Sequence, residues 1–156
     1  MNGLVELIFE RVPDVAVATM LSELLRRSGI QEMTHSELGK LDAETSFRDV
    51  IALLRHQAEP SSIFIRAGIA TVGAVRTRCP LVRLLRYEET NELTLAFERT
   101  DIEAVDRKDT IRMLSDGAKL LASSAGTAEY YCGFEPATDE RTRLFSKSKI
   151  GPLVSV

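Results

Sequence analysis

Hydrophobic and polar residues alternate most clearly between residues 81 and 98, and this alternation predicts a β-hairpin. A loop at 89–91 would end in an asparagine, a residue that tolerates the left-handed backbone such loops need. Tyr87 would then lie opposite Leu93. One face would be apolar apart from Arg83, and would carry Leu81, Leu85, Tyr87, Leu93, Leu95 and Phe97.

The opposite face of this hairpin mixes apolar and charged side chains. A fully solvated antiparallel face should not gather apolar residues, so we expect another molecule or another part of the chain to cover it. An apolar centre with a charged rim is typical of a protein interface. The candidate binding surface on this face consists of Val82, Leu84, Arg86 and Ala96.

In two further segments near the N-terminus, apolar residues recur at a regular spacing. Alternation predicts a strand at residues 5–10, and apolar residues at helical spacing predict a helix at residues 14–28. The apolar stripe of this helix includes Leu24 and should pack on the sheet.

The remaining elements are predicted from capping residues and β-rich runs. Ser46, with Asp49 three residues later, starts a second helix that must end before Pro60. The polar segment 34–44 fits either a short helix or a structured loop. The other expected elements are strands at 61–67, 71–77 and 129–135, and a helix that Asp106 caps and Gly126 ends.

Helices separated by a run of consecutive strands favour an α+β fold. We expect a two-layer sandwich in which a largely antiparallel sheet of about five or six strands is covered by about three helices. Residues 1–136 would form a single domain and residues 137–156 a C-terminal tail. Because the tail contains Leu144, Phe145 and Ile150, we expect it to dock on the domain or on a partner, and it could cover the mixed hairpin face.

Composition indicates an ordinary globular protein. The chain has 156 residues, of which 44% are hydrophobic and 28% charged, and a net charge of -3. This balance disfavours disorder and a dedicated nucleic-acid-binding domain. The N-terminus lacks a positively charged leader, and the longest weakly polar stretch, 63–75, is too short to span a bilayer. We therefore expect a cytoplasmic protein with no membrane contact.

The chain carries no recognisable catalytic or metal-binding motif. Its histidines are His35 and His56 only, without metal-ligand spacing. Cys79 and Cys132 lie far apart and are expected to be unpaired thiols. Two glycines at Walker spacing are followed by Ala74 where lysine is required. No catalytic residue, metal site or cofactor is therefore assigned, which makes an enzyme the less favoured interpretation.

Two alternative sites remain open. A small ligand or substrate could bind in a pocket around Tyr130, Tyr131 and Glu135, the most distinctive local string. A single-stranded nucleic acid could bind arginines of the β-rich region, although nearby glutamates oppose phosphate. Those arginines are Arg76, Arg78, Arg83 and Arg86.

The favoured function is therefore a non-catalytic protein that binds another protein or associates with itself. Small size, mildly acidic balance and the lack of a catalytic signature suit an immunity or antitoxin-type inhibitor, which blocks a toxin by covering its active site. The sequence does not identify the partner.

Overall fold

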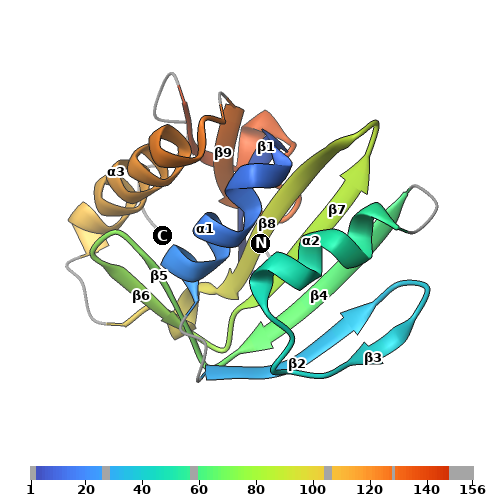
Figure 1. Ribbon diagram of the computed structural model, residues 1–156. Helices are drawn as coiled ribbons and strands as arrows, with labels where there is room; N and C mark the ends of the chain where they lie inside the picture. Colours follow the sequence, from blue (N-terminus) through green and yellow to red (C-terminus); the bar gives the residue numbers. More distant parts are fainter. Residues whose placement is uncertain (1–2, 26–28, 57–59, 104–106, 128, 148–156) are drawn as a thin grey trace.

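An antiparallel sheet forms one layer of the protein and helices form the other (Figure 1), and the computed structural model describes residues 3–25, 29–56, 60–103, 107–127 and 129–147. Within these residues the sheet has eight strands in the order β10-β9-β1-β8-β7-β4-β2-β3. These strands are β1 (Leu4–Val12), β2 (Ile30–His35), β3 (Gly39–Leu41), β4 (Ser61–Ala67), β7 (Leu81–Tyr87), β8 (Thr90–Glu98), β9 (Glu129–Phe134) and β10 (Arg143–Ser146). A separate hairpin pairs β5 (Ile69–Val72) with β6 (Val75–Arg78).

All three described α-helices cover the same face of the sheet (Figure 1). They are α1 (Asp14–Leu24), α2 (Phe47–Arg55) and α3 (Arg107–Ala125), and short 3-10 turns lie at Arg99–Asp101 and Glu140–Thr142. The β5–β6 hairpin packs against α3, where Gly73 at the turn meets Gly117 of the helix. A Cβ atom on Gly117 would come within 2.7 Å of the Val72 carbonyl carbon, so this contact requires glycine. The α+β class is thus confirmed, with a larger sheet than expected.

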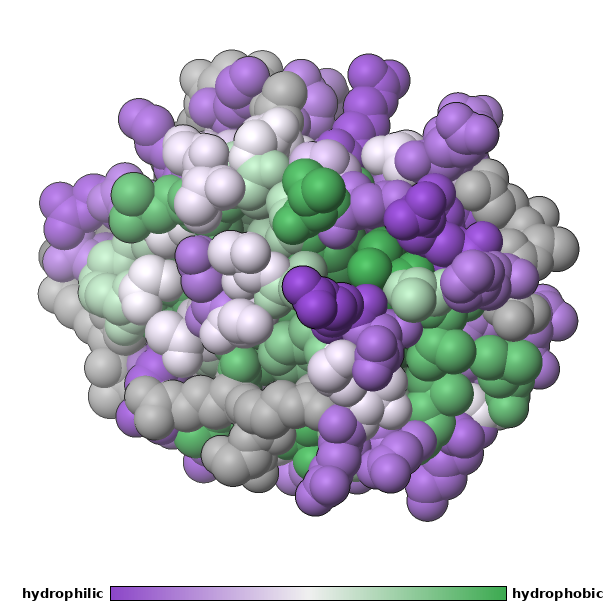
Figure 2. Space-filling view, viewed as in Figure 1, coloured by the Kyte–Doolittle hydropathy of each residue, from purple (hydrophilic) through white to green (hydrophobic). Residues whose placement is uncertain are grey.

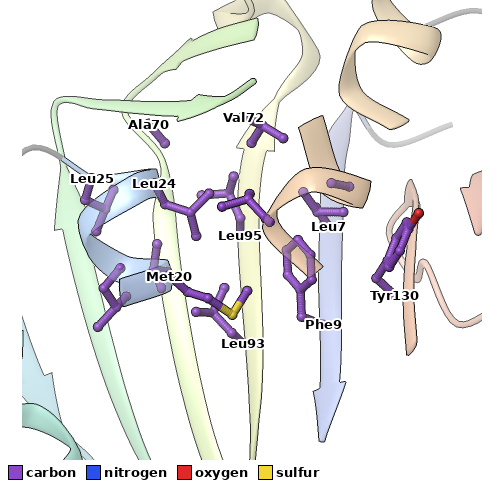
Figure 3. Close-up of a cluster of buried hydrophobic side chains, with 14 of the residues drawn as sticks. Leu7, Phe9, Met20, Leu24, Leu25, Ala70, Val72, Leu93, Leu95 and Tyr130 are labelled. Atoms are coloured by element: carbon purple, nitrogen blue, oxygen red, sulfur yellow. The ribbon is translucent and has the colours of Figure 1, made fainter. Parts of the chain in front are cut away.

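Helix α1 supplies the centre of the core. Pro13 precedes it with extended backbone, and the Pro13 carbonyl accepts a hydrogen bond from the Ala16 amide at 2.9 Å. Its apolar stripe includes Met20 and Leu24, which point toward Leu95 and its neighbours on β8 (Figure 3). The buried residues of this helix are Ala16, Val17, Met20, Leu21 and Leu24.

The sequence missed strands at both edges of the sheet. In the segment 34–44, expected as a helix or loop, residues 34–41 belong to the β2–β3 hairpin, in which Met33 pairs with Leu41. Residues 137–147, expected to be part of a tail, include β10, which pairs with β9 and buries Leu144 and Phe145. Edge strands need only one paired side and carry many polar residues, so their alternation is weak. Ile150 lies outside the described residues.

The β7–β8 hairpin has a different register from the predicted one. Its turn is the pair Glu88 and Glu89, with φ of 50° and 62°, and Tyr87 lies opposite Thr90. Both turn residues adopt the left-handed conformation of a tight two-residue turn. Compared with the predicted pairing, the strands shift by an odd number of residues, and an odd shift turns one strand over relative to the other. The β8 half of the predicted apolar face, with Leu93, Leu95 and Phe97, is buried under the helices as expected, whereas its β7 half, with Leu81, Leu85 and Tyr87, points away from them.

Arg86 illustrates the corrected orientation. Its side chain lies on the helix side of the sheet, where Nη1 donates a hydrogen bond to Asp14 Oδ1 at 2.5 Å. Asn91 Nδ2 donates to the same carboxylate at 2.7 Å and to the Val12 carbonyl at 3.0 Å. Arg55 lies 3.5 Å from the other oxygen of Asp14. These contacts tie the start of α1 to the β7–β8 hairpin and to the end of β1.

Leu24→Asp should unfold the protein or lower its free energy of unfolding by about 4 kcal/mol, because it places a charge in the core between α1 and β8. The matched control is Val15→Asp on the same helix, where the parent side chain is 91% exposed. Thermal and urea unfolding should leave the control near the parent. A cooperative Leu24→Asp variant of parental stability would contradict the orientation of α1.

The Asp14 cluster should make stability depend on acid pH. Burial alone would raise the pKa of Asp14, but hydrogen bonds from Asn91 and Arg86, with the charges of Arg86 and Arg55, hold it below its ordinary value of 3.8. A carboxyl whose folded pKa is lowered contributes stability above its unfolded pKa and loses it as pH falls through the folded value.

Asp14→Asn is therefore expected to lower the free energy of unfolding at pH 7 by roughly 1–2 kcal/mol, and this difference should shrink as pH falls below about 4. Urea titrations of parent and variant across this range measure it. The exposed Asp116→Asn serves as a control and should follow the parent. A difference for Asp14→Asn that stays constant with pH would contradict the assignment.

Candidate functional site

The sheet face turned away from the helices, here called the open face, is the candidate site. Along each strand it receives the residues that alternate with the buried core positions, since side chains in a strand point to opposite faces. No described helix packs on it (Figure 1). Its central members are Leu4, Glu6, Ile8 and Glu10 of β1, Glu92, Thr94 and Ala96 of β8, Leu81, Arg83 and Leu85 of β7, Phe64 and Arg66 of β4, and Tyr131 of β9.

Glu6 sits in a hollow of this face because its cross-strand neighbours are small. It pairs with Ala96 on β8 and with Gly133 on β9. Gly133 cannot be replaced without moving the chain, since a Cβ atom there would lie 2.7 Å from the Thr142 carbonyl oxygen. The carboxylate of Glu6 therefore stands between positions whose side chains cannot cover it.

Two shallow depressions mark the open face. The first, about 170 Å³ in volume, is the hollow around Glu6, and the second, about 390 Å³, adjoins it. Phe64 and Leu81 line both depressions, and the Phe64 side chain is 37% exposed. The hollow is lined by Leu4, Glu6, Phe64, Leu81, Arg83, Thr94, Ala96 and Glu135, and its neighbour by Glu32, Thr34, Phe64, Arg66 and Leu81.

Carboxylates dominate the charge at the hollow. Burial raises the pKa of Glu6 above 4.5, and the negative charges of Glu135 and Glu92 add to this, while Arg83 opposes it. Burial also raises the pKa of Glu92, although Arg83 Nη2 donates a hydrogen bond to Glu92 Oε1 at 3.3 Å. Within the described residues no donor or cation is paired directly with the Glu6 carboxylate. Its ionised form is thus less stable in the isolated chain than in water.

Thr94 supplies an unused hydrogen-bonding group at the same place. It is only 6% exposed, it lines the hollow, and its hydroxyl has no hydrogen-bond partner among the described residues. Arg83 Nε, on the cross-strand neighbour, is likewise buried without a partner in the described part of the chain. Buried polar atoms are seldom left unsatisfied in folded proteins, so this pair makes the hollow a candidate contact site.

Tyr131 forms the other end of the open face. Its hydroxyl donates a hydrogen bond to Glu10 Oε1 at 3.1 Å, and the Arg143 guanidinium lies 4.8 Å from the centre of its ring. Burial, followed by the Glu10 charge, raises the pKa of the Tyr131 hydroxyl. These contacts hold Tyr131 as a neutral hydrogen-bond donor at the border of the face.

The predicted hairpin surface is only partly accessible. Val82 and Leu84 point into the core and are fully buried, and Arg86 joins the Asp14 cluster, so these three cannot form an exposed contact surface. Ala96 alone lies on the open face. The error follows from the register. Asn91, predicted to end a loop at 89–91, is buried and anchors α1, and the observed turn consists of Glu88 and Glu89.

The alternative pocket is also divided between two faces. Tyr130 faces the helices, with its ring centroid 6.0 Å from that of Phe9 (Figure 3), whereas Tyr131 faces the opposite way. Glu135, after the end of β9, lines the hollow around Glu6. The sequence could have indicated Glu6 from the predicted first strand and Phe64 from the predicted strand 61–67, but not that these strands bring them together.

The remaining reactive groups form no second site in the described part of the chain. Cys79 and Cys132 are unpaired as predicted, and burial raises the pKa of the Cys132 thiol. His35 is buried and accepts hydrogen bonds from the amides of Glu37 and Leu38 through Nδ1. Among the described residues no three metal-ligating side chains cluster, and no helix is long and apolar enough to cross a membrane.

Comparison with known proteins gives one family match and one structural match for this chain. A family model described as PABL017 Cdi1I immunity protein matches residues 3–150. Among solved structures, the chain superposes with a TM-score of 0.80 and 22% identity on a chain of a crystal structure of the toxic C-terminal tip of CdiA from Pseudomonas aeruginosa in complex with immune protein. The superposition covers 98% of this chain and 99% of that chain, which establishes the shared fold. A comparison with curated proteins gave no match. Because the family model spans almost the whole sequence, the chain belongs to the PABL017 Cdi1I immunity protein family.

Proposed function

We propose that this immunity protein neutralises a CdiA-type toxin by binding the toxin's C-terminal tip with the open face of its sheet. The observation that carries the proposal is the family match over residues 3–150. The crystal structure with the same fold contains such a toxin tip with its immune protein, which supports a partner of the same kind. Inhibition then requires no chemistry, only a stable complex that blocks the toxin surface.

The open face has the composition of a protein interface. Phe64 supplies a partly exposed aromatic ring at its centre, with Leu81 beside it, and charged side chains such as Arg66 and Glu32 form the border. Aromatic anchors next to pockets carry much of the energy in protein interfaces, and a polar rim surrounds them. An immunity protein built this way would present one continuous surface that needs little rearrangement.

The helix-bearing side offers a weaker candidate. Figure 2 shows that side with hydrophilic and hydrophobic side chains interspersed. Its most exposed apolar residues, Val15 on α1 and Leu120 on α3, are on different helices, and single exposed apolar residues are normal on a protein surface. The Thr94 hydroxyl, which has no hydrogen-bond partner among the residues that the structure describes, lies on the open face instead, which supports that face as the contact surface.

The cytoplasm of the cell that makes the protein is the proposed site of action. The immunity protein would meet the toxin tip there after its delivery and bind it before it acts. Fast association would be an advantage, and the acidic residues of the open face would accelerate it toward a basic toxin surface.

Co-production with a CdiA-type C-terminal toxin tip, sought in the reading frames next to the gene of this chain, tests the proposed function. The two chains should copurify as a stable complex, and growth of cells that express the toxin segment should be restored by this chain. If the purified proteins do not bind at micromolar concentration and growth stays arrested, the proposed function is wrong.

Phe64→Ala should weaken toxin binding by about 30-fold, because it removes the aromatic anchor at the centre of the open face. The matched control is Leu120→Ala on α3, where the parent side chain is 69% exposed on the other side of the molecule. Both variants should melt near the parent temperature. If Leu120→Ala impairs binding and Phe64→Ala does not, the contact surface lies on the helices.

A further inference from the structure

We infer that the hollow around Glu6 receives one basic side chain, a lysine or an arginine, from the toxin. This inference rests on the proposed function and names the chemistry that the open face recognises. Four observations carry it: the uncovered carboxylate, the unused hydroxyl of Thr94, the size of the hollow and the apolar walls.

The carboxylate of Glu6 is placed to accept a cation. Its neighbours Ala96 and Gly133 are too small to cover it, and the nearby Arg83 already donates to Glu92. The negative charges of Glu135 and Glu92 act on the Glu6 carboxylate in the same direction as its burial, and Arg83 acts against them. A cation that enters the hollow would therefore gain a charge-assisted hydrogen bond in a partly desolvated setting.

The Thr94 hydroxyl is an independent sign that something binds here. More than nine-tenths of Thr94 is buried, the residue lines the hollow, and its buried Oγ1 has no partner among the described residues. A buried hydroxyl without a partner destabilises the folded chain relative to one that is satisfied. An ammonium or guanidinium group has several N–H donors, so in the hollow one would reach the Glu6 carboxylate and another, after a small shift of the side chains that cover it, Thr94 Oγ1, because both residues line the same depression.

The dimensions fit a side chain. The hollow holds about 170 Å³, less than the 300 Å³ or more that is typical of small-molecule sites. Leu4, Phe64 and Leu81 form its apolar walls. Lysine and arginine bury their aliphatic stems against such walls while the charged end reaches polar groups.

Affinity measurements with the toxin segment and four variants test the inference. Glu6→Gln removes the charge but keeps the shape, and should weaken binding roughly 10- to 100-fold. Thr94→Val removes the hydroxyl and should weaken it by about threefold or more. Glu6→Asp keeps the charge and should bind more tightly than Glu6→Gln. Glu23→Gln on α1 makes the same charge change at an exposed position on the helix side and should bind as the parent does.

Melting temperatures separate binding from folding. The raised folded pKa of Glu6 means that its ionised form, present at neutral pH, does not stabilise the free chain, so Glu6→Gln should melt at or above the parent temperature. If Glu6→Gln melts at a lower temperature than the parent, the toxin affinities of Glu6→Asp and Glu6→Gln are compared instead, since this comparison tests the charge at position 6. The inference is overturned if Glu6→Asp then binds no better than Glu6→Gln.

The pH dependence gives a further readout. Cation binding needs ionised Glu6, whose pKa is raised above 4.5 by burial and by Glu135 and Glu92, against the opposing charge of Arg83. Toxin affinity of the parent should fall as pH is lowered through that raised pKa, and the ratio of parent to Glu6→Gln affinity should shrink toward one. A ratio that does not change with pH would overturn the inference.

Failure of this inference is distinguishable from failure of the proposed function. If the parent binds the toxin segment and Glu6→Gln binds within about twofold of it, the hollow receives no cation although the function stands. If the parent itself does not bind the toxin segment, the proposed function and this inference are both wrong. Weaker binding by Glu6→Gln and Thr94→Val, with Glu23→Gln unchanged, supports the basic side chain.

Discussion

The tight turn at Glu88 and Glu89 determines which half of the central hairpin residues is buried. Because strand residues alternate between faces, the turn sends Val82 and Leu84 toward the helices and Arg83 and Thr94 to the open face. The same register brings Arg86 and Asn91 onto Asp14, so it also anchors the first helix. Core packing, helix placement and the chemistry of the open face all depend on these two residues adopting positive φ.

The sequence predicts the elements with strong local signals. Ser46 caps α2 by accepting a hydrogen bond from the Asp49 amide at 3.1 Å, and the predicted strand 61–67 coincides with β4. Local alternation cannot determine the register of the hairpin. The same pattern of apolar and polar residues is compatible with the predicted three-residue loop and with the observed two-residue turn. The polar edge strands were missed for a related reason: they are specified by pairing with β4 and β9 rather than by their own side chains.

Function was easier to predict than the site. Small size, mild acidity and the absence of catalytic motifs favoured a protein that binds another protein, with an immunity or antitoxin-type inhibitor as one example, and the family match over residues 3–150 confirms the immunity type. The residues of the open face come from strands distant in the sequence, since Glu6 of β1 and Thr94 of β8 become neighbours only through sheet pairing. A pattern confined to one hairpin could not bring them together.

The period of two in the strands has a consequence for how such proteins diversify. Residues that hold the core and residues that face outward occupy alternate positions, so Phe64 or Arg66 can change while Ile63 and Ile65 remain in the core. A single strand thus carries two nearly independent selective pressures, one for folding and one for partner choice. A fold retained at a TM-score of 0.80 with only 22% identity fits this separation. New specificities can then arise by substitution on one face of an unchanged scaffold. Gly133 is an exception, because it lies on the open face but the backbone packed against it leaves no room for a side chain.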